Sequence, residues 1–417
     1  MDRNPDLRAR AKVKCRVIYL ATQRFRVCFL NARFFPIGGT AIRTLNFARA
    51  IKNRVSSVNI VTWQPTDSEE YRSEAPVFVL DGILVNSMPL RHRFLRSYFR
   101  FLYLLTLMLE FSKFARAVVE KNKVDVIHCA NDTVWIGAFL SKFTKIPIVA
   151  DFHAKPFLPG LEVLPESLGS VHSFMSKVAL KIIDKSIDMY LTPTEELRTL
   201  LISWGLPSTK VIAIPNAVYL GEQQTRKSRT TIRAELNIKE GTIVIAFHGM
   251  LSERYNIDAL RNLSNISRII QDNSQLKVKF IIIGYYDKVP PIDDASFIYT
   301  GYVKDLQEYL NAADFALVPI FRAEGIRSRF LDYFKAALPV LTTSVGVTGM
   351  AFVQDSGGVI VRDDVKELAD SAIELGRSPE KLREMARKSG NLVNWFLPEK
   401  IGVELISLYD HIIHKKD

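Results

Sequence analysis

The chain has 417 residues, of which 48% are hydrophobic and 24% charged, with a formal net charge of +12. This composition excludes a disordered or fibrous chain, and the length favours two domains over a single core. The cysteines Cys15, Cys28 and Cys129 form no C-x-x-C motif, which argues against a zinc site or disulfide framework and favours a reducing compartment. The excess positive charge suits nucleic acid, an anionic membrane surface or a phosphorylated ligand.

The first 24 residues form a basic extension, and their apolar stretch from Arg16 to Ala21 is shorter than a secretory h-region. No apolar segment reaches the ~20 residues that are needed to span a bilayer. We therefore expect a soluble or peripheral protein, cytoplasmic and at most held at the inner face of a membrane.

The first predicted strand is the compact apolar run 25–31, which is followed by Gly38 and Gly39, a segment with helical spacing (43–51) and a second strand (58–62). Strand, glycine turn, helix and strand begin a doubly wound α/β domain. The two glycines allow a backbone to approach a ligand closely at the carboxyl end of the first strand. A plain tight turn explains them equally well.

Residues 90–119 combine arginines with aromatic and aliphatic side chains, beginning with Arg91, Arg93, Arg96 and Arg100. One interpretation is a basic, aromatic helix that lies on an anionic membrane surface. The other is a long helix packed on the sheet, with its arginines solvated. The two are compatible if only the arginine-rich end touches lipid.

Two further buried strands are predicted at 124–129 and 146–150, and the second leads into Asp151 and His153. Ligands of α/β proteins usually bind at the carboxyl ends of such strands. A lone histidine is more often structural than functional. A neutral imidazole there could bond a transferred group or a departing phosphate.

The composition turns polar and basic between residues 219 and 240, and we place a domain boundary there. Before it, the pattern predicts strands at 189–193 and 211–218 around a helix at 194–204. After it, strands are predicted at 242–247, 278–283, 298–301, 313–319, 338–341 and 357–361.

The segment 323–350 reads as a loop that enters a helix at Gly325, followed by a short buried strand and a glycine turn. Unpaired N–H groups at such a helix start suit a phosphate, to which Arg327 and Arg329 could add charge-assisted hydrogen bonds. Asp332, about two turns into the predicted helix, suits ribose hydroxyls. The bland alternative is an amphipathic helix with arginines on a solvated face.

Glu324 with Asp332 resembles the E-x7-E signature of retaining glycosyltransferases with the GT-B fold, with Asp in the second place. The run from Gly325 to Arg329 is similar to the G-x-R-x-K variant of glycosyltransferase family 4, and LPVLTTSVGVTGM is similar to the segment that follows it there. Three residues depart from the family pattern and leave open a reduced or altered activity: Ala217, Asp332 and Leu338.

Other segments extend the resemblance in the same order along the chain. Gly38 and Gly39 resemble the glycine-rich turn that faces the donor diphosphate. His153 matches the family's D/E-x-H placement, and this resemblance favours a functional role for it over a structural one. The run from Gly249 to Asn256 resembles the family's G-x-L-x-x-R-P-N donor loop, in which Arg254 holds the arginine place.

The resemblance implies two Rossmann-like, doubly wound α/β domains that face a cleft, with a C-terminal helix crossing back to the first domain. The expected divisions are a basic extension (1–24), an acceptor-side domain (25–218), a linker (219–240), a nucleotide-sugar-binding domain (241–395) and the returning helix (396–417).

The activity implied is retaining transfer of a sugar, of the hexosyltransferase type, from a nucleotide-diphosphate sugar to a glycan or lipid-linked acceptor in cell-surface polysaccharide or glycoconjugate synthesis. His153 and Glu324 would be catalytic and Asp332 would bind the ribose. The residues expected at the donor diphosphate are Gly38, Gly39, Gly249, Arg254, Gly325, Ile326, Arg327 and Arg329. No D-x-D run is present to hold a metal ion, so no metal or other cofactor is expected.

Two alternatives stay open. An epimerase or hydrolase of the same fold would act on nucleotide sugars, but it needs further acid/base carboxylates that the sequence does not identify. A basic module that binds nucleic acid or anionic lipid would use the charge and the arginines of 90–119. No helix-turn-helix, RNP or zinc signature supports nucleic-acid binding, so no nucleic acid is expected.

Overall fold

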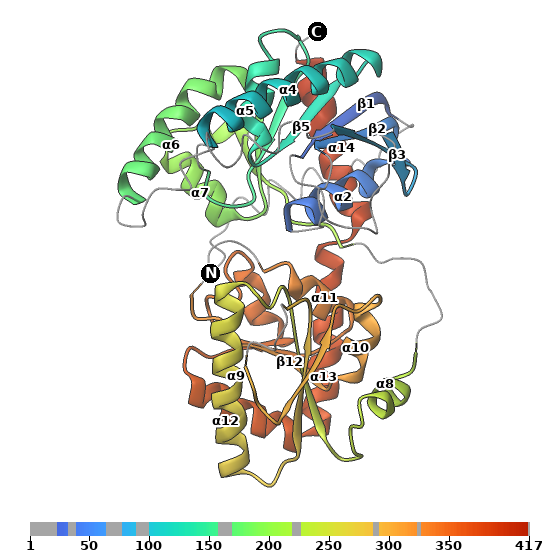
Figure 1. Ribbon diagram of the computed structural model, residues 1–417, viewed down its shortest axis with the longest axis vertical. Helices are drawn as coiled ribbons and strands as arrows, with labels where there is room; N and C mark the ends of the chain where they lie inside the picture. The colour runs from blue at the N-terminus through green and yellow to red at the C-terminus, as the bar shows by residue number, and fades with distance from the viewer. Residues whose placement is uncertain are drawn as a thin grey trace, which may run out of the picture.

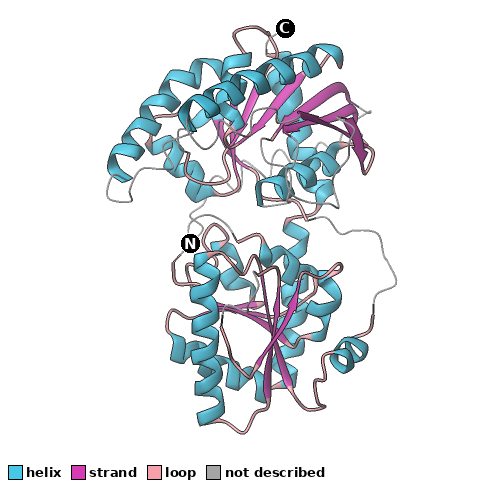
Figure 2. Cartoon of the chain, in the orientation of Figure 1, coloured by secondary structure: helices cyan, strands magenta, loops and turns pink. Residues whose placement is uncertain are grey.

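The computed structural model describes residues 23–31, 39–63, 77–88, 100–156, 169–218, 227–286, 292–322 and 327–415. They form two α/β lobes, each built on one sheet with helices packed against it (Figure 1, Figure 2). The expected fold class is confirmed, including the C-terminal helix that crosses back to the first lobe. Among the described residues, no helix is long and apolar enough to cross a membrane.

The first lobe holds an eight-stranded sheet in the order β3-β4-β2-β1-β5-β6-β7-β8, parallel except that β3 runs antiparallel to β4. Its strands are β1 (Gln23–Leu30), β2 (Val55–Trp63), β3 (Val77–Leu80), β4 (Ile83–Met88), β5 (Val126–Ala130), β6 (Ile148–Asp151), β7 (Met189–Thr192) and β8 (Val211–Ala213). The helices are α2 (Gly39–Ile51), α4 (Arg100–Lys121), α5 (Thr133–Leu140), α6 (Gly169–Ile183) and α7 (Glu195–Ser203).

The second lobe holds a six-stranded parallel sheet in the order β11-β10-β9-β12-β13-β14. Its strands are β9 (Ile243–His248), β10 (Val278–Ile283), β11 (Phe297–Gly301), β12 (Phe315–Val318), β13 (Val340–Thr342) and β14 (Val359–Val361). The later helices are α8 (Arg229–Glu235), α9 (Arg254–Asn273), α10 (Leu306–Ala312), α11 (Arg329–Lys335), α12 (Val365–Arg377), α13 (Pro379–Asn391) and α14 (Pro398–His414).

Strand β1 shows why the first sheet is covered on both faces. Val27 and Phe29 point into the core that includes α2 and α14, whereas Cys28 and Leu30 point into the core that includes α4 and α5. Side chains of a strand alternate between faces, so a continuous apolar run requires apolar layers on both sides.

The hairpin of β3 and β4 was absent from the sequence predictions, although the sequence carries a signal for it. Asp81 and Gly82 form a two-residue turn, with φ angles of 51° and 77°. Such a turn needs left-handed backbone at both positions, which an Asp-Gly pair adopts readily.

Helix α14 belongs to the first lobe in packing although it follows the second in sequence. Leu405 and Tyr409 are buried in the core around β1 and α2. A Cβ atom at Gly402 would lie 2.5 Å from the carbonyl oxygen of Ala50, so the close approach of α14 to α2 requires glycine there. The chain passes between the lobes twice, near Val218 and near Phe396. The Val218 N–H donates to the Phe396 carbonyl at 2.8 Å and so joins these two connecting segments.

Helix α4 begins at Arg100 within the described residues, and 89–99 lie outside them. Leu107, Phe111 and Ala115 of α4 are buried in the core of the first lobe. The part of the predicted basic, aromatic helix that the structure describes is therefore packed on the sheet.

Each sheet has one point at which the strand order reverses. In the first sheet β1 lies between β2 and β5, and in the second β9 lies between β10 and β12. Ligands of doubly wound sheets bind beyond the carboxyl ends of the strands at these points. The segments that follow β1 and β9 are therefore where a site is expected.

Candidate functional site

In the first lobe, a buried ion pair joins the end of β6 to helix α2. Asp151 accepts hydrogen bonds from Arg43 Nε at 2.8 Å and from Nη2 at 3.0 Å, and the two side chains are only 2% and 1% exposed. The remaining guanidinium nitrogen, Nη1, donates to Asn216 Oδ1 at 2.7 Å. Arg43 thus connects α2, β6 and the segment after β8.

Two histidines share the same carboxylate. His128 Nε2 lies 3.3 Å and His153 Nε2 lies 3.1 Å from Asp151 Oδ2. An ionised carboxylate only accepts, so both histidines carry their proton on Nε2. Tyr409 of α14 then donates its hydroxyl proton to His128 Nδ1 at 2.7 Å, and Nδ1 of His153 is left as an acceptor.

The protonation states follow from burial and charge. Burial alone would raise the pKa of Asp151, but the Arg43 guanidinium and the two histidines hold it well below its ordinary value. Burial lowers the pKa of His153, against the opposing effect of Asp151. At neutral pH the network therefore contains a carboxylate, an arginine cation and a neutral imidazole at His153.

Replacing Tyr409 with phenylalanine is expected to allow His128 to populate both tautomers, because the hydroxyl that donates to Nδ1 is lost. The loss of one buried hydrogen bond should lower the free energy of unfolding by about 1 kcal/mol. Histidine ring nitrogen shifts in NMR spectra would report the tautomer. The matched control is Tyr190→Phe, which removes a buried hydroxyl outside this network. An unchanged His128 tautomer in Tyr409→Phe would contradict the hydrogen bonds assigned to His128.

The turn after β1 is the second feature of this lobe. Gly39 is the first residue of α2, and Gly38 lies outside the described residues. Asn31 Nδ2 donates to Thr44 Oγ1 at 2.8 Å, and Asn131 Nδ2 donates to Thr40 Oγ1 at 3.1 Å. The start of α2 is thus held beside the loop after β5, which also holds His153 through a bond from its N–H to Asn131 Oδ1.

In the second lobe, Arg329 lies at the carboxyl end of β9. Its Nη2 donates to Asn256 Oδ1 at 2.7 Å, and its guanidinium carbon lies 4.9 Å from the ring centroid of Phe247. Nη1 is buried and has no hydrogen-bond partner among the described residues. A buried charged donor without an acceptor is costly in a finished fold, and a bound anion at Nη1 would supply the missing acceptor.

Gly249 permits this arrangement. A Cβ atom there would lie 2.8 Å from Arg329 Nη2, and one at Gly284 would lie 1.8 Å from the Gly249 carbonyl oxygen. The loops after β9 and β10 therefore pack backbone to backbone at Gly249, leaving space for the guanidinium. Arg254, at the first position of α9, is exposed beside the same loop.

Arg327 is buried, and its guanidinium carbon lies 5.2 Å from the ring centroid of Tyr255. The structure thus brings Arg327, Arg329 and the Gly249 loop together around the start of α9.

Helix α11 begins at Arg329, not at Gly325 as predicted, with Ser328 as its N-cap residue. Arg329 is consequently the first helical residue and Asp332 lies in the first turn, not two turns in. Phe330 and Leu331 N–H groups bond the carbonyls of Arg327 and Ser328, so the preceding turn is tighter than a regular helix. Glu324, Gly325 and Ile326 lie outside the described residues.

Asp332 and His248 lie side by side, with His248 Nε2 at 3.6 Å from Asp332 Oδ2. Partial burial raises the pKa of Asp332 to about 6, although Lys335 and Arg329 act in the opposite direction. The Asp332 side chain keeps 42% of its surface exposed, so it can still meet a ligand. Burial and the nearby Arg329 charge lower the pKa of His248 to about 3, so this imidazole is neutral.

Sequence reasoning missed the residues that hold the predicted ones in place. Arg43, His128 and Tyr409 surround Asp151 and His153, whereas His248 and Asn256 support Arg329. Only Asn256 had a signal, since it ends the segment that resembles the donor loop.

A cavity of about 500 Å³ lies elsewhere on the second lobe, between β14 and α13. Val359 and Lys388 are among its lining residues, and none of the predicted site residues is. It therefore has no part in the arrangement above.

Two family models match the chain. The model of Glycosyltransferase Family 4 matches residues 37–222, and that of Glycosyl transferases group 1 matches residues 242–378. The two matches thus fall on the two lobes. No curated protein matches the chain significantly.

Solved structures share the fold over nearly the whole chain. Anabaena HepE in complex with UDP and glucose has a TM-score of 0.68 at 14% identity, covering 93% of this chain and 100% of HepE. Sucrose-phosphate synthase from Thermosynechococcus elongatus has 0.70 at 15%, covering 94% and 100%. WaaG, a glycosyltransferase involved in lipopolysaccharide biosynthesis, has 0.60 at 15%, covering 90% and 98%.

Proposed function

The chain belongs to the GT-B glycosyltransferases of the family 4, group 1 type, and from that premise we propose that it transfers a sugar from a nucleotide-diphosphate donor to a glycan or lipid-linked acceptor with retention of configuration. The donor-binding part of this proposal is supported by Arg329. Its guanidinium is buried at the carboxyl end of β9, and Nη1 lacks an acceptor among the described residues.

The donor diphosphate would bind to Arg329 and Arg254, close to the backbone of Gly249. Two arginines supply positive charge where negative charge develops on the leaving diphosphate. We therefore propose that transfer needs no metal ion, and that activity persists in EDTA. UDP-hexoses are the first donors to test, because HepE was crystallised with UDP and glucose.

The proposed role of His153 is to accept a hydrogen bond from a hydroxyl of the transferred sugar. Its Nε2–H is held by Asp151, so Nδ1 presents a lone pair in a fixed direction. Glu324 would hold further sugar hydroxyls from the opposite side. Such contacts orient the anomeric carbon without a covalent intermediate.

Retention would follow from attack on the face from which the diphosphate departs. The acceptor oxygen forms the new bond to the anomeric carbon while the carbon–oxygen bond to phosphate breaks. The acceptor proton passes to the departing phosphate oxygen, so no protein base is required. Cell-surface polysaccharide or glycoconjugate synthesis is the proposed setting, with the protein cytoplasmic and peripheral at the membrane.

The affinity for UDP-glucose is expected to fall several-fold as the pH drops from about 7.5 to about 5, because Asp332 titrates near 6. The ionised carboxylate accepts hydrogen bonds from ribose hydroxyls, and its neutral form accepts them less well. His248 is neutral throughout this pH range, so its protonation does not change the affinity. Calorimetric titrations would measure the effect, and Asp332→Asn should give a flat profile; an equally steep profile in that variant would remove Asp332 from the ribose site.

The test of the proposed function is binding of UDP, GDP, ADP and TDP by calorimetry in EDTA, followed by incubation with the sugar form of the nucleotide that binds. Transfer to added glycan or lipid-linked acceptors, with product anomeric configuration read by NMR, would support the proposal. Release of free sugar or of an epimer alone would instead identify a hydrolase or an epimerase. No binding of any nucleotide would overturn the donor site.

A further inference from the structure

Helix α6 exposes a row of large apolar side chains. Five of them keep between 39% and 71% of their surface exposed: Val171, Phe174, Met175, Val178 and Ile182. Apart from the adjacent pair Phe174 and Met175, they recur every three or four residues and so lie along one side of the helix, which we call the α6 stripe. The helix packs on the lobe through another face, where Ser176 and Leu180 are buried.

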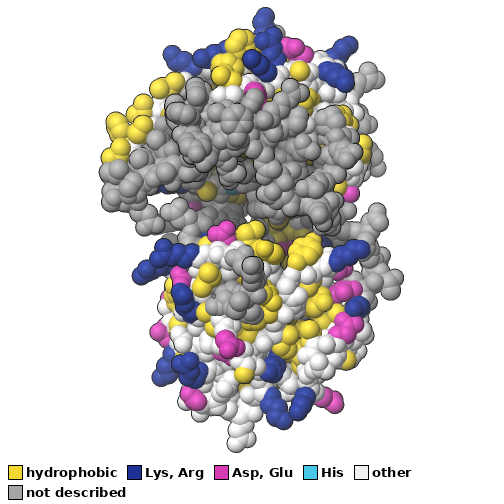
Figure 3. All heavy atoms as spheres, in the orientation of Figure 1, with side chains coloured by type: hydrophobic (Ala, Val, Ile, Leu, Met, Phe, Trp, Pro, Cys, Tyr) yellow, Lys and Arg dark blue, Asp and Glu magenta, His cyan; other side chains and the backbone are white. Residues whose placement is uncertain are grey.

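Figure 3 shows hydrophobic side chains gathered at the left edge of the first lobe, where α6 runs in Figure 1. A soluble surface normally scatters single apolar residues, whereas a continuous row of this kind marks an interaction site.

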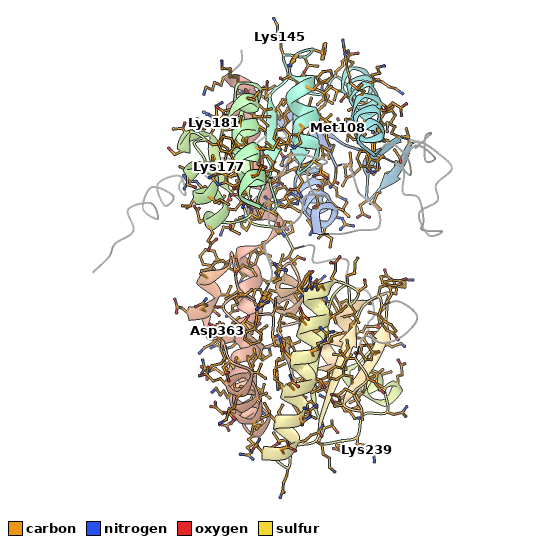
Figure 4. All side chains as sticks on the ribbon, turned by 60° about the vertical axis from the view of Figure 1, so that its left-hand side comes forward. Met108, Lys145, Lys177, Lys181, Lys239 and Asp363 are labelled. Atoms are coloured by element: carbon orange, nitrogen blue, oxygen red, sulfur yellow. The ribbon has the colours of Figure 1, made fainter. Side chains whose placement is uncertain are left out.

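Lysines border the α6 stripe on one side. Lys181 and Lys185 are exposed, and Lys177 lies with its Nζ 5.5 Å from the ring centroid of Trp204. Lys177 and Lys181 project from the helix along the outer side of the lobe (Figure 4). Helix α6 itself contains no Asp or Glu. Asp184, which follows the helix and precedes Lys185, pairs with Lys210 at 3.2 Å.

We propose that the α6 stripe docks on an anionic lipid bilayer, with Phe174 and Ile182 entering the boundary between headgroups and acyl chains. A helix that combines an apolar row with flanking lysines binds this interface through apolar burial and attraction to acidic lipids. The lysine stems lie along the apolar surface while their ammonium groups reach the headgroups.

A second copy of this chain fits the stripe less well. Two α6 helices packed stripe to stripe would bring lysines against lysines without any carboxylate of α6 to pair them. An anionic bilayer would bury the apolar side chains of the α6 stripe and would also pair the lysines with acidic headgroups.

The inference deepens the membrane-peripheral setting of the proposed function, on which it rests, by naming the docking surface and its lipid. Membrane docking and nucleotide binding use different lobes, so the two are measured separately. The inference also differs from contact through residues 90–119. In the described part of α4, Leu109 is the large apolar residue exposed to solvent, and Leu107 and Phe111 are buried. Leu109 therefore provides a matched control on the same lobe.

The experiment is flotation of the full chain with vesicles of phosphatidylcholine, alone or with about one third phosphatidylglycerol. We expect binding that depends on the anionic lipid and weakens with salt.

Phe174→Ser/Ile182→Ser should reduce binding at least about ten-fold, because two apolar side chains that enter the bilayer are lost. Lys181→Glu/Lys185→Glu should reduce it about ten-fold at low salt and little at high salt. Leu109→Ser should bind like the wild type.

Thermal unfolding and calorimetric UDP binding would show that each variant is folded. Equal flotation of the wild type and the Phe174→Ser/Ile182→Ser variant would overturn the proposal, as would absence of flotation or binding to neutral vesicles alone. A wild-type dimer that the same double variant dissociates, without vesicle binding, would make a second copy the occupant. Flotation that is lost in this variant while UDP fails to bind the wild type would support membrane docking and count only against the proposed function.

Discussion

Replacing Arg329 with alanine is expected to weaken UDP binding about 100-fold or more while leaving the fold intact. The guanidinium is buried, is oriented by Asn256 and Phe247, and offers Nη1 to a ligand. Alanine removes the charge and the directed donors together. Calorimetry with the wild type and the variant would measure the loss.

Two comparisons sharpen this prediction. Arg329→Lys keeps the charge but cannot reproduce the planar fork that Asn256 orients, so it should recover only part of the affinity. Arg261→Ala removes an exposed arginine of α9 that pairs with Asp258, and should bind UDP like the wild type. Wild-type affinity in Arg329→Ala would disprove the donor assignment, whereas unfolding of that variant would show in its thermal transition.

Replacing Arg43 with alanine is expected to lower the free energy of unfolding by about 3–5 kcal/mol, because it leaves the Asp151 carboxylate buried without its bidentate partner. The chain offers a control with the same chemistry and different burial. Arg26 pairs with Asp125 through two nitrogens at 2.9 Å, but these side chains are 34% and 28% exposed. Arg26→Ala should therefore cost only about 0–1 kcal/mol.

The pH dependence of these variants gives a second test. In the wild type, the lowered pKa of Asp151 contributes stability that is present above its unfolded pKa and is lost as the pH falls through the folded pKa. In Arg43→Ala, burial without Arg43 raises that pKa, so the variant loses stability as the pH rises. The difference between wild type and Arg43→Ala should thus grow from mildly acidic to neutral pH. A difference no larger than that of Arg26→Ala at any pH would show that the burial of Asp151 is not what makes the pair important.

Local patterns determined most of the fold. Apolar runs predicted twelve of the strand positions within a few residues, because a strand buried on both faces is apolar throughout. The glycines after β1 and β9 and the arginines before and in α11 were predicted as site residues from short motifs. The pair β3 and β4 was missed although Asp81 and Gly82 carried its signal.

Tertiary structure alone decided which polar groups meet. His128 and Tyr409 are hydrogen-bonded at a separation of 281 residues, and Arg43 reaches Asp151 over 108. No local pattern encodes such contacts, because they depend on how α2, α14 and the sheet pack and on the need of each buried polar group for a partner. The contacts of the Arg329 guanidinium with Asn256 and Phe247 likewise join α11 to α9 and β9, which are distant in the sequence. The sequence therefore determined the strands, the turns and the residue types of the site, and the packing of distant elements determined their protonation states and orientations.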